Sequence, residues 1–179
     1  MKRLLFPLLV LSVAAGCTAI RTAPPTATAT LEAKSGSNVS GVVRFTEVMA
    51  DGVPAVQVSI DARNVPPGVH GFHVHENGDC SAADATSAGG HFNPESHKHG
   101  GPAASSSHAG DFGNVLAGDG GLVDATYLMR GVTLGAGNHS ITGRAVVLHA
   151  DPDDLVTDPT GNAGTRIACG VITMNNPAR

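Results

Sequence analysis

The 179-residue chain contains few aromatic and few charged residues, and it has no tryptophan. Aromatic side chains make up 3% of the chain and charged side chains 15%. No long basic run occurs and the formal net charge is −4, so the sequence does not support nucleic-acid binding. A long amphipathic helical pattern is also missing, and the 23 glycines and 11 prolines argue against a helical bundle or a coiled coil. The apolar share of 41% suffices for the core of one domain.

The apolar run near the N-terminus is too short to cross a bilayer as a helix. It extends from Leu4 to Ala15, whereas a spanning helix needs about 20 residues. With two basic residues before it, the run predicts a signal peptide over residues 1–16. The AAGC ending is similar to that of bacterial lipoproteins, which predicts lipidation of Cys17 and membrane anchoring. The alternative is a plain signal peptide cleaved near Ala15, and both predict an extracytoplasmic location, in the periplasm or at the cell surface.

Thr, Ala and Pro dominate the segment that follows the predicted signal peptide. Such a composition cannot build a core, and its prolines keep the chain extended. We therefore expect residues 17–35 to form a tether and residues 36–179 to form the folded domain.

The chain has three cysteines, Cys17, Cys80 and Cys169. If Cys17 carries lipid, the other two remain as an even pair. In an exported domain such a pair can form a disulfide, because disulfides persist outside the cytoplasm. Two buried free thiols are the alternative.

Apolar and polar residues alternate with period two in several short segments, which indicates β-strands. Glycine-rich turns separate these segments, so we predict an antiparallel all-β sandwich or barrel. Two long stretches, residues 77–110 and 150–166, do not fit strands and are expected to be functional loops. The alternating apolar positions are Val39, Val43, Phe45, Val56, Val58, Ile60, Phe72, Val74, Val146 and Leu148.

All nine histidines lie between His70 and His149, a clustering that is typical of a metalloprotein. His73 and His75 occupy alternate positions of a predicted strand, so both side chains project from one face. Two nitrogen donors on a rigid face suit copper or zinc, although this pair alone is a weak signal. His149 ends another predicted strand and is the natural partner of the pair.

The first long loop carries a second set of potential ligands. Three histidines and one carboxylate form an N₃O set that fits tetrahedral zinc, and an ion bound there would order the loop. The alternative is that these residues are solvated polar groups. The set consists of His91, His99, His108 and Asp111. For the remaining histidines we expect structural hydrogen bonding at His70 and His139, and solvent exposure at His97.

Six segments together resemble the copper–zinc superoxide dismutase family, over nearly the whole domain from Val39 to Thr173. The resemblance implies a flattened, eight-stranded antiparallel Greek-key β-barrel with two long functional loops. The segments are GFHVHENGDC (71–80), GGHFNP (89–94), KHGGP (98–102), HAGDFGN (108–114), GRAVVLHADPDDL (143–155) and GNAGTRIACGVI (161–172).

The resemblance also implies a site that holds one copper and one zinc ion per subunit. It implies that His91 bridges the two metals, that Asp153 links a copper ligand, His73, to a zinc ligand, His99, and that Cys80 and Cys169 form a disulfide. Arg166 would dock an anionic substrate over the copper, and Thr160 would narrow the channel. The implied copper ligands are His73, His75, His91 and His149, and the implied zinc ligands are His91, His99, His108 and Asp111.

The implied activity is conversion of two superoxide anions to dioxygen and hydrogen peroxide, with His91 and Arg166 as catalytic residues. The stretch between His149 and Arg166 carries four aspartates and no lysine, so we expect attraction of the anion to depend mainly on Arg166. One alternative is an exported copper- or zinc-binding module, a buffer or chaperone-like relative of the same fold. Another is an adhesive surface lipoprotein that metals only stabilise. A homodimer is compatible with the sequence but is not specified by it.

Overall fold

The alternating segments of the N-terminal half build the first of two β-sheets. In the computed structural model, which describes residues 23–104 and 106–175, β1 (Thr26–Ala33), β2 (Ser40–Ala50), β3 (Val53–Arg63) and β6 (Val123–Arg130) pair antiparallel in the order β1-β2-β3-β6. The β2–β3 hairpin turns at Asp51 and Gly52, which have φ angles of 54° and 78°. Two positive φ angles suit a two-residue hairpin turn, and the register of this long hairpin follows from it.

The second sheet carries most of the predicted ligands. It consists of β4 (Gly68–His75), β5 (Asp111–Ala117), β7 (Ala145–His149) and β8 (Arg166–Val171), in the order β5-β4-β7-β8. A two-residue strand, β9 (Thr173–Met174), pairs with β1. The chain enters this sheet after β3, returns to the first sheet for β6 and then crosses back for β7, so strands that are distant in sequence become neighbours.

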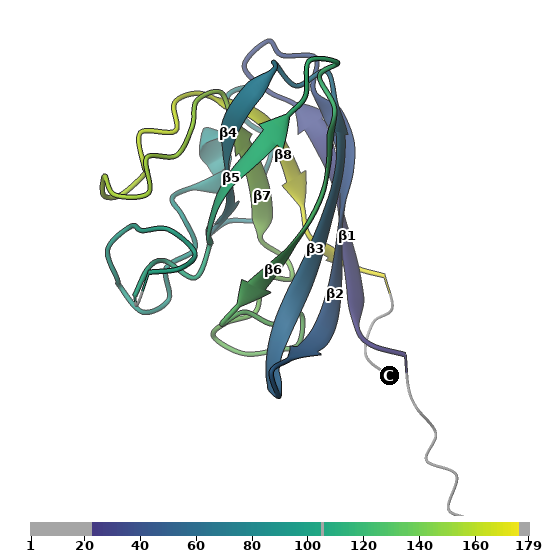
Figure 1. The fold of residues 1–179 in the computed structure, drawn as a ribbon, viewed down its shortest axis with the longest axis vertical. Helices are drawn as coiled ribbons and strands as arrows, with labels where there is room; N and C mark the ends of the chain where they lie inside the picture. The colour runs from purple at the N-terminus through teal and green to yellow at the C-terminus, as the bar shows by residue number, and fades with distance from the viewer. Residues whose placement is uncertain (1–22, 105, 176–179) are drawn as a thin grey trace, which may run out of the picture.

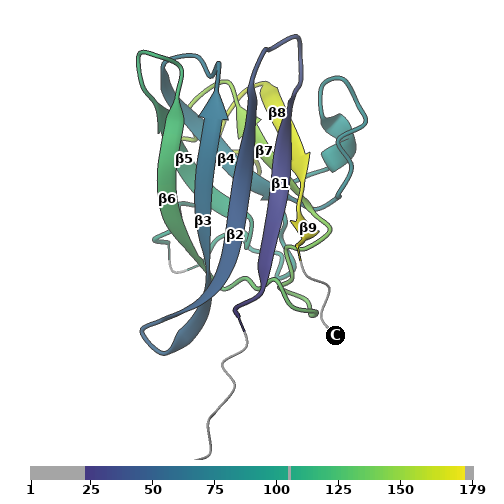
Figure 2. The ribbon, with the colours of Figure 1, turned by 90° about the vertical axis from the view of Figure 1, so that its right-hand side faces the viewer.

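The two sheets face each other and form a nearly closed barrel (Figures 1 and 2). They are joined at one side, where Glu32 and Ala33 of β1 pair with Cys169 and Ala168 of β8. In the described part of the chain no ladder joins β5 to β6 on the other side. The predicted eight-stranded Greek-key barrel is therefore confirmed, with β9 as a short addition.

The apolar core lies between the sheets, and the predicted inward positions occupy it. Phe45, Phe72 and Leu148 are at most 1% exposed, and the Phe72 and Phe112 rings meet edge to face at a centroid distance of 5.3 Å. β4 from His70 onward and all of β7 are buried on both faces. One face of these strands contacts the core, and the other is covered by the two long loops, which lie on the outer side of the second sheet (Figure 1). A short 3₁₀ helix, η1 (Thr86–Ala88), lies in the first of these loops.

The predicted boundary between tether and domain is wrong. Residues 26–33 lie within the predicted tether but form β1, and Ala27, Ala29 and Leu31 are at most 2% exposed. The small alanine side chains alternate with threonines and fit between the sheets. A segment rich in Thr and Ala can therefore form a strand although its composition resembles that of a tether. The predicted signal peptide and Cys17 lie outside the described residues. No helix in the described ranges is long and apolar enough to cross a membrane.

Candidate metal centre

Strands β4 and β7 place three imidazoles on the outer face of the second sheet. The β4–β7 register pairs Phe72 with Leu148 and His73 with Val147, so the core residues share one face and the histidines the other. His75 Nε2 and His149 Nε2 lie 3.4 Å apart. The first long loop adds His91, which forms an isolated bridge with His75, and its ring centroid lies 4.0 Å from that of His73. We call these four residues the first group: His73, His75, His91 and His149.

Backbone carbonyls and one carboxylate set the orientation of these rings. His75 Nδ1 donates to the carbonyl of Gly89 at 3.0 Å, and His149 Nδ1 donates to that of Gly164 at 3.3 Å. In both residues Nε2 is therefore the nitrogen left without a proton. His73 is turned the other way, because its Nε2 donates to Asp153 Oδ2 at 2.8 Å and leaves Nδ1 free.

A second group of ligands converges on one carboxylate oxygen. The Nδ1 atoms of His91, His99 and His108 lie 2.9, 3.0 and 3.2 Å from Asp111 Oδ1. The other oxygen of Asp111 accepts hydrogen bonds from the backbone N–H groups of Gly100 and His108, both at 3.0 Å. These two bonds hold the carboxylate toward the imidazoles. The second group, His91, His99, His108 and Asp111, thus shares His91 with the first group.

Asp153 connects the two groups through their outer nitrogens. Its Oδ2 accepts from His73, and its Oδ1 accepts from His99 Nε2 at 2.9 Å. Burial alone would raise the pKa of Asp153, but hydrogen bonds from His73, Leu155 and His99 lower it to about 2. Asn114 fixes the backbone of Asp153 from both sides, at 2.8 Å each. The carboxylate is therefore an anion that orients one imidazole in each group.

Both groups can hold a metal ion. Within each group one donor atom from every residue lies within 4.8 Å of the others. His73 Nδ1 and His91 Nε2 are buried with no hydrogen-bond partner among the described residues, although buried polar atoms nearly always have one. Burial lowers the pKa of His73 to about 4 and that of His149 to about 3, so these rings are neutral and offer lone pairs. Four imidazole nitrogens suit copper, and the N₃O set suits tetrahedral zinc.

Arg166 borders the cavity next to the first group. The β7–β8 register places it opposite His149. Its Nη1 and Nη2 donate to the carbonyls of Ala85 and Gly89 at 2.7 and 2.8 Å. The cavity has a volume of about 500 Å³, and Arg166 is the one Lys or Arg among the described residues that line it. Its lining also includes His75, His91, His149 and Thr160.

The comparison with known families matches this geometry. A family model described as copper/zinc superoxide dismutase (SODC) matches residues 39–172. The chain belongs to the copper–zinc superoxide dismutase family. The resemblance found in the sequence is thereby confirmed, and the family normally binds both metals.

A solved member of the fold shows how far the likeness extends. The crystal structure of the clock protein EA4 is 40% identical in sequence to this chain, with a TM-score of 0.74. The match covers 87% of this chain and 98% of that chain. The likeness therefore extends over nearly the whole length of that protein.

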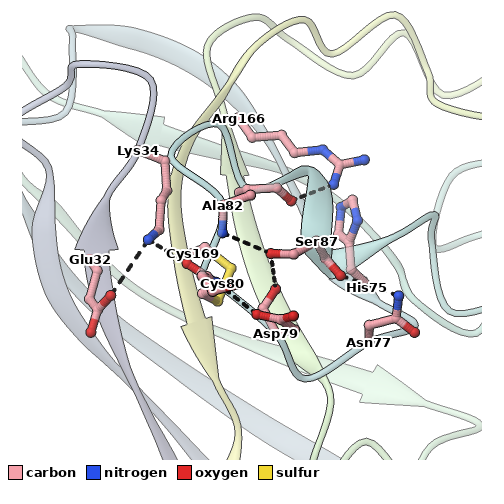
Figure 3. Close-up of a disulfide and its surroundings, with 12 residues drawn as sticks. Glu32, Lys34, His75, Asn77, Asp79, Cys80, Ala82, Ser87, Arg166 and Cys169 are labelled. Atoms are coloured by element: carbon pink, nitrogen blue, oxygen red, sulfur yellow. Dashed lines mark hydrogen bonds and ion pairs between the residues drawn. A yellow bond between two sulfur atoms is a disulfide. The ribbon is translucent and has the colours of Figure 1, made fainter.

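The disulfide that membership of the superoxide dismutase family implies is present. Cys80 and Cys169 are bonded with their Cα atoms 5.7 Å apart, and the bond joins the first long loop to β8 (Figure 3). Cys169 lies three residues after Arg166, so the bond fastens the loop beside the strand that carries the guanidinium. The alternative of two free thiols is excluded.

The other histidines of this superoxide dismutase family member lie outside both groups. Both ring nitrogens of the buried His70 face carbonyls, those of His149 and Pro66. His139 Nδ1 donates to the carbonyl of Gly131 at 2.8 Å, which matches the expected structural hydrogen bonding. His97 is half-buried rather than fully solvated, because its Nδ1 donates to the carbonyl of Ser107 at 3.1 Å.

Two polar residues with no predicted role, Asn114 and Asp158, help to position the second group. Asn114 holds the backbone of Asp153 through two hydrogen bonds. It ends the segment HAGDFGN (108–114), three residues after Asp111, and this position is the one feature of the sequence that points to it. Asp158 Oδ1 accepts from the backbone N–H of His99 at 2.7 Å and lies 3.7 Å from His108 Nε2. Asp158 is one of four aspartates in the second long loop, and nothing in its local sequence distinguishes it from the other three.

Proposed function

We propose that the protein is a superoxide dismutase that holds one copper ion in the first group and one zinc ion in the second. The reaction converts two superoxide anions and two protons into dioxygen and hydrogen peroxide. The observation that supports it best is the position of His91, whose two ring nitrogens face different ligand groups beside a cavity bordered by Arg166. When bound, copper supplies reversible one-electron transfer, while zinc supplies a redox-inert positive charge.

Arg166 would bind and orient the substrate. A guanidinium stays charged at every working pH and presents five N–H donors in a planar fork. Two of the three guanidinium nitrogens are held by the carbonyls of Ala85 and Gly89, so the group is fixed at the cavity wall. Its remaining N–H groups are available to a small anion. Thr160 is exposed and lines the same cavity, so it limits the width of the mouth.

His91 would hold and deliver a proton. Its Nδ1 faces Asp111, and its Nε2 has no hydrogen-bond partner within residues 23–104 and 106–175. A proton held at Nε2 therefore lies on the side of the first group, next to the cavity where peroxide forms. The hydrogen bonds of the second group keep the ring in place while Nε2 gains and loses this proton.

A copper- or zinc-binding module of the same fold is the second candidate. This candidate is supported by the likeness to a protein described as a clock protein, because a shared fold does not by itself specify an enzymatic activity. A binding module has no use for a fixed guanidinium at the cavity, and a structural role could be served by zinc alone. The copper dependence of superoxide decay separates these functions.

The decisive experiment measures the rate of superoxide decay after pulse radiolysis in the presence of the purified protein. The copper and zinc content is determined on the same sample. We expect rapid decay that is lost when copper is removed and restored when copper is added back. Protein that carries zinc only is the matched control and should be inactive. Slow decay with both metals bound would overturn the proposal and favour the binding module.

We further propose that the protein acts outside the cytoplasm, anchored through a lipid on Cys17. The support comes from the N-terminal sequence pattern and from the Cys80–Cys169 disulfide, which is typical of oxidising compartments. Labelling with radioactive palmitate should mark the wild-type protein in the membrane fraction. Cys17→Ala should remove the label and release the protein; a Cys17→Ala protein that is still labelled would contradict the anchor.

A further inference from the structure

The turn that follows β1 holds the start of the disulfide loop, residues 80–89. Lys34 is only 9% exposed, and its Nζ donates to the carbonyl of Cys80 at 2.5 Å (Figure 3). The carboxylate of Glu32 also lies near Nζ, with Oε2 3.6 Å away, but the Glu32 side chain is 69% exposed. Burial of an ammonium group is costly unless it is hydrogen-bonded. The contact with the Cys80 carbonyl is therefore needed whenever Lys34 stays buried.

The same turn also binds the beginning of β8. The backbone N–H of Lys34 donates to the carbonyl of Ile167 at 2.9 Å, and Ser35 Oγ donates to the carbonyl of Arg166 at 2.9 Å. The backbone N–H of Ser35 donates to the carbonyl of Ala83 at 2.7 Å. The turn thus fixes the disulfide loop and the backbone of Arg166 relative to each other.

The far end of the disulfide loop holds the guanidinium of Arg166. Its two acceptors, the carbonyls of Ala85 and Gly89, lie on either side of η1. The disulfide attaches the Cys80 side chain to β8, but it provides no hydrogen-bond donor for the Cys80 carbonyl oxygen. Lys34 satisfies that carbonyl and so restrains the backbone that leads to Ala85.

We propose that Lys34 is a positioning residue for Arg166, acting through the disulfide loop. The bond from Lys34 to Cys80 sets where the loop begins, and the loop sets where Arg166 points its free N–H groups. Lys34 borders neither the cavity nor a ligand group, so it does not touch the substrate. This inference rests on the proposed function, in which Arg166 docks a small anion.

The test is azide affinity of the copper- and zinc-loaded protein, followed by visible absorption, since azide is a small monovalent anion. Lys34→Met keeps the length of the buried stem but removes the donor, and we expect its Kd for azide to rise about fivefold. Lys34→Arg keeps the charge and the donor and should restore most of the affinity. Arg44→Gln removes one positive charge from an exposed position on β2 and is the charge-matched control. It should leave the Kd unchanged at about 0.15 M salt, where screening is strong.

Amide hydrogen exchange provides a second readout that does not depend on the bound anion. Peptides covering residues 76–90 should exchange faster in Lys34→Met than in wild type, with metal content and disulfide unchanged. A merely structural role would lower the melting temperature but leave the azide affinity of the folded protein unaltered, and that result would overturn the proposal. So would a loss of affinity that Lys34→Arg does not restore.

A failure of the proposed function can be distinguished from a failure of the proposal for Lys34. A metal-loaded wild type that binds azide but does not dismutate superoxide would refute the enzyme activity, and the comparison of azide affinities would still decide the role of Lys34.

Discussion

Arg166 and His75 share one hydrogen-bond acceptor, the carbonyl oxygen of Gly89. Arg166 Nη2 donates to it at 2.8 Å and His75 Nδ1 donates to it at 3.0 Å. A displacement of this carbonyl would therefore move the guanidinium of Arg166 and turn the ring of His75 at the same time. The disulfide loop thus links the position of the Arg166 guanidinium to the orientation of the His75 ring.

Replacement of Arg166 should slow the reaction and change its dependence on salt. We expect Arg166→Ala to lower the rate constant for superoxide about tenfold, and Arg166→Glu to lower it further, because a local positive charge accelerates capture of an anion. Rates measured by pulse radiolysis at several ionic strengths check this. The control is Arg63→Ala, which removes a charge from a side chain that is 69% exposed on the opposite sheet. This variant should leave the rate constant unchanged. An Arg166→Glu protein with the wild-type rate and salt slope would refute the assignment.

Asp153→Asn should lower the metal affinity of at least one of the two groups, because Asp153 bonds to one imidazole of each. An amide can present only one acceptor oxygen, so His73 or His99 loses its outer partner and its fixed orientation. Loss of such an outer partner typically lowers metal affinity about 10- to 100-fold. Competition with a chromophoric zinc chelator measures the change. Asp154→Asn is the matched control, because Asp154 lies next in sequence and bonds to Thr157 and Asn162 rather than to a ligand.

His91→Ala should disturb both metals at once, because one residue belongs to both groups. We expect loss of most activity, together with weaker zinc binding and a less ordered first loop. Metal analysis of the purified variant, with hydrogen exchange over residues 91–111, provides the measurement. His97→Ala is a histidine control from the same loop that belongs to neither group. Full activity in His91→Ala would contradict its assignment as the shared ligand.

Removal of the disulfide should destabilise the fold through the unfolded state. The two cysteines are 89 residues apart, and the chain-entropy model gives about 4–5 kcal/mol for closing a loop of that length. Urea unfolding of Cys80→Ser/Cys169→Ser against wild type measures the difference. An equal free energy of unfolding in the two proteins would contradict the chain-entropy account of this disulfide.

Glu47 should stabilise the fold in a pH-dependent way. Burial would raise the pKa of its carboxyl, but hydrogen bonds from Thr133 Oγ1 and from the N–H groups of Leu134 and Gly135 lower it below the ordinary value of 4.5. A lowered pKa in the folded state contributes stability above the pKa of the unfolded state, and this contribution is lost as the pH falls through the folded value.

The corresponding variant is Glu47→Gln, for which we expect a loss of about 1–2 kcal/mol at neutral pH. The difference from wild type should diminish as the pH falls below 4.5. Denaturant unfolding at a series of pH values measures it. A difference that is constant from neutral to acid pH would show that the carboxylate charge contributes nothing.

The sequence by itself determined the antiparallel all-β fold class and the positions of the two long loops, whereas the Cys80–Cys169 disulfide was implied by the family resemblance and is shown by the structure. Alternation such as Val56-Val58-Ile60 follows from the two-residue period of a strand, so the segment itself predicts its structure. The same period predicted that His73 and His75 share a face opposite Phe72 and Val74. The motifs also identified Asp153 and Arg166 as candidates, although no local pattern explains their positions.

Tertiary structure decided everything that depends on contacts across the chain. Thr26–Ala33 is a strand only because β2 and β8 lie beside it, and small alanines fit between the sheets. The ring orientations of His75 and His149 depend on the carbonyls of Gly89 and Gly164, which come from other segments. The contact of Lys34 with Cys80 spans 46 residues. Local periodicity carries no information about such pairs, because loop conformation and sheet closure bring them together.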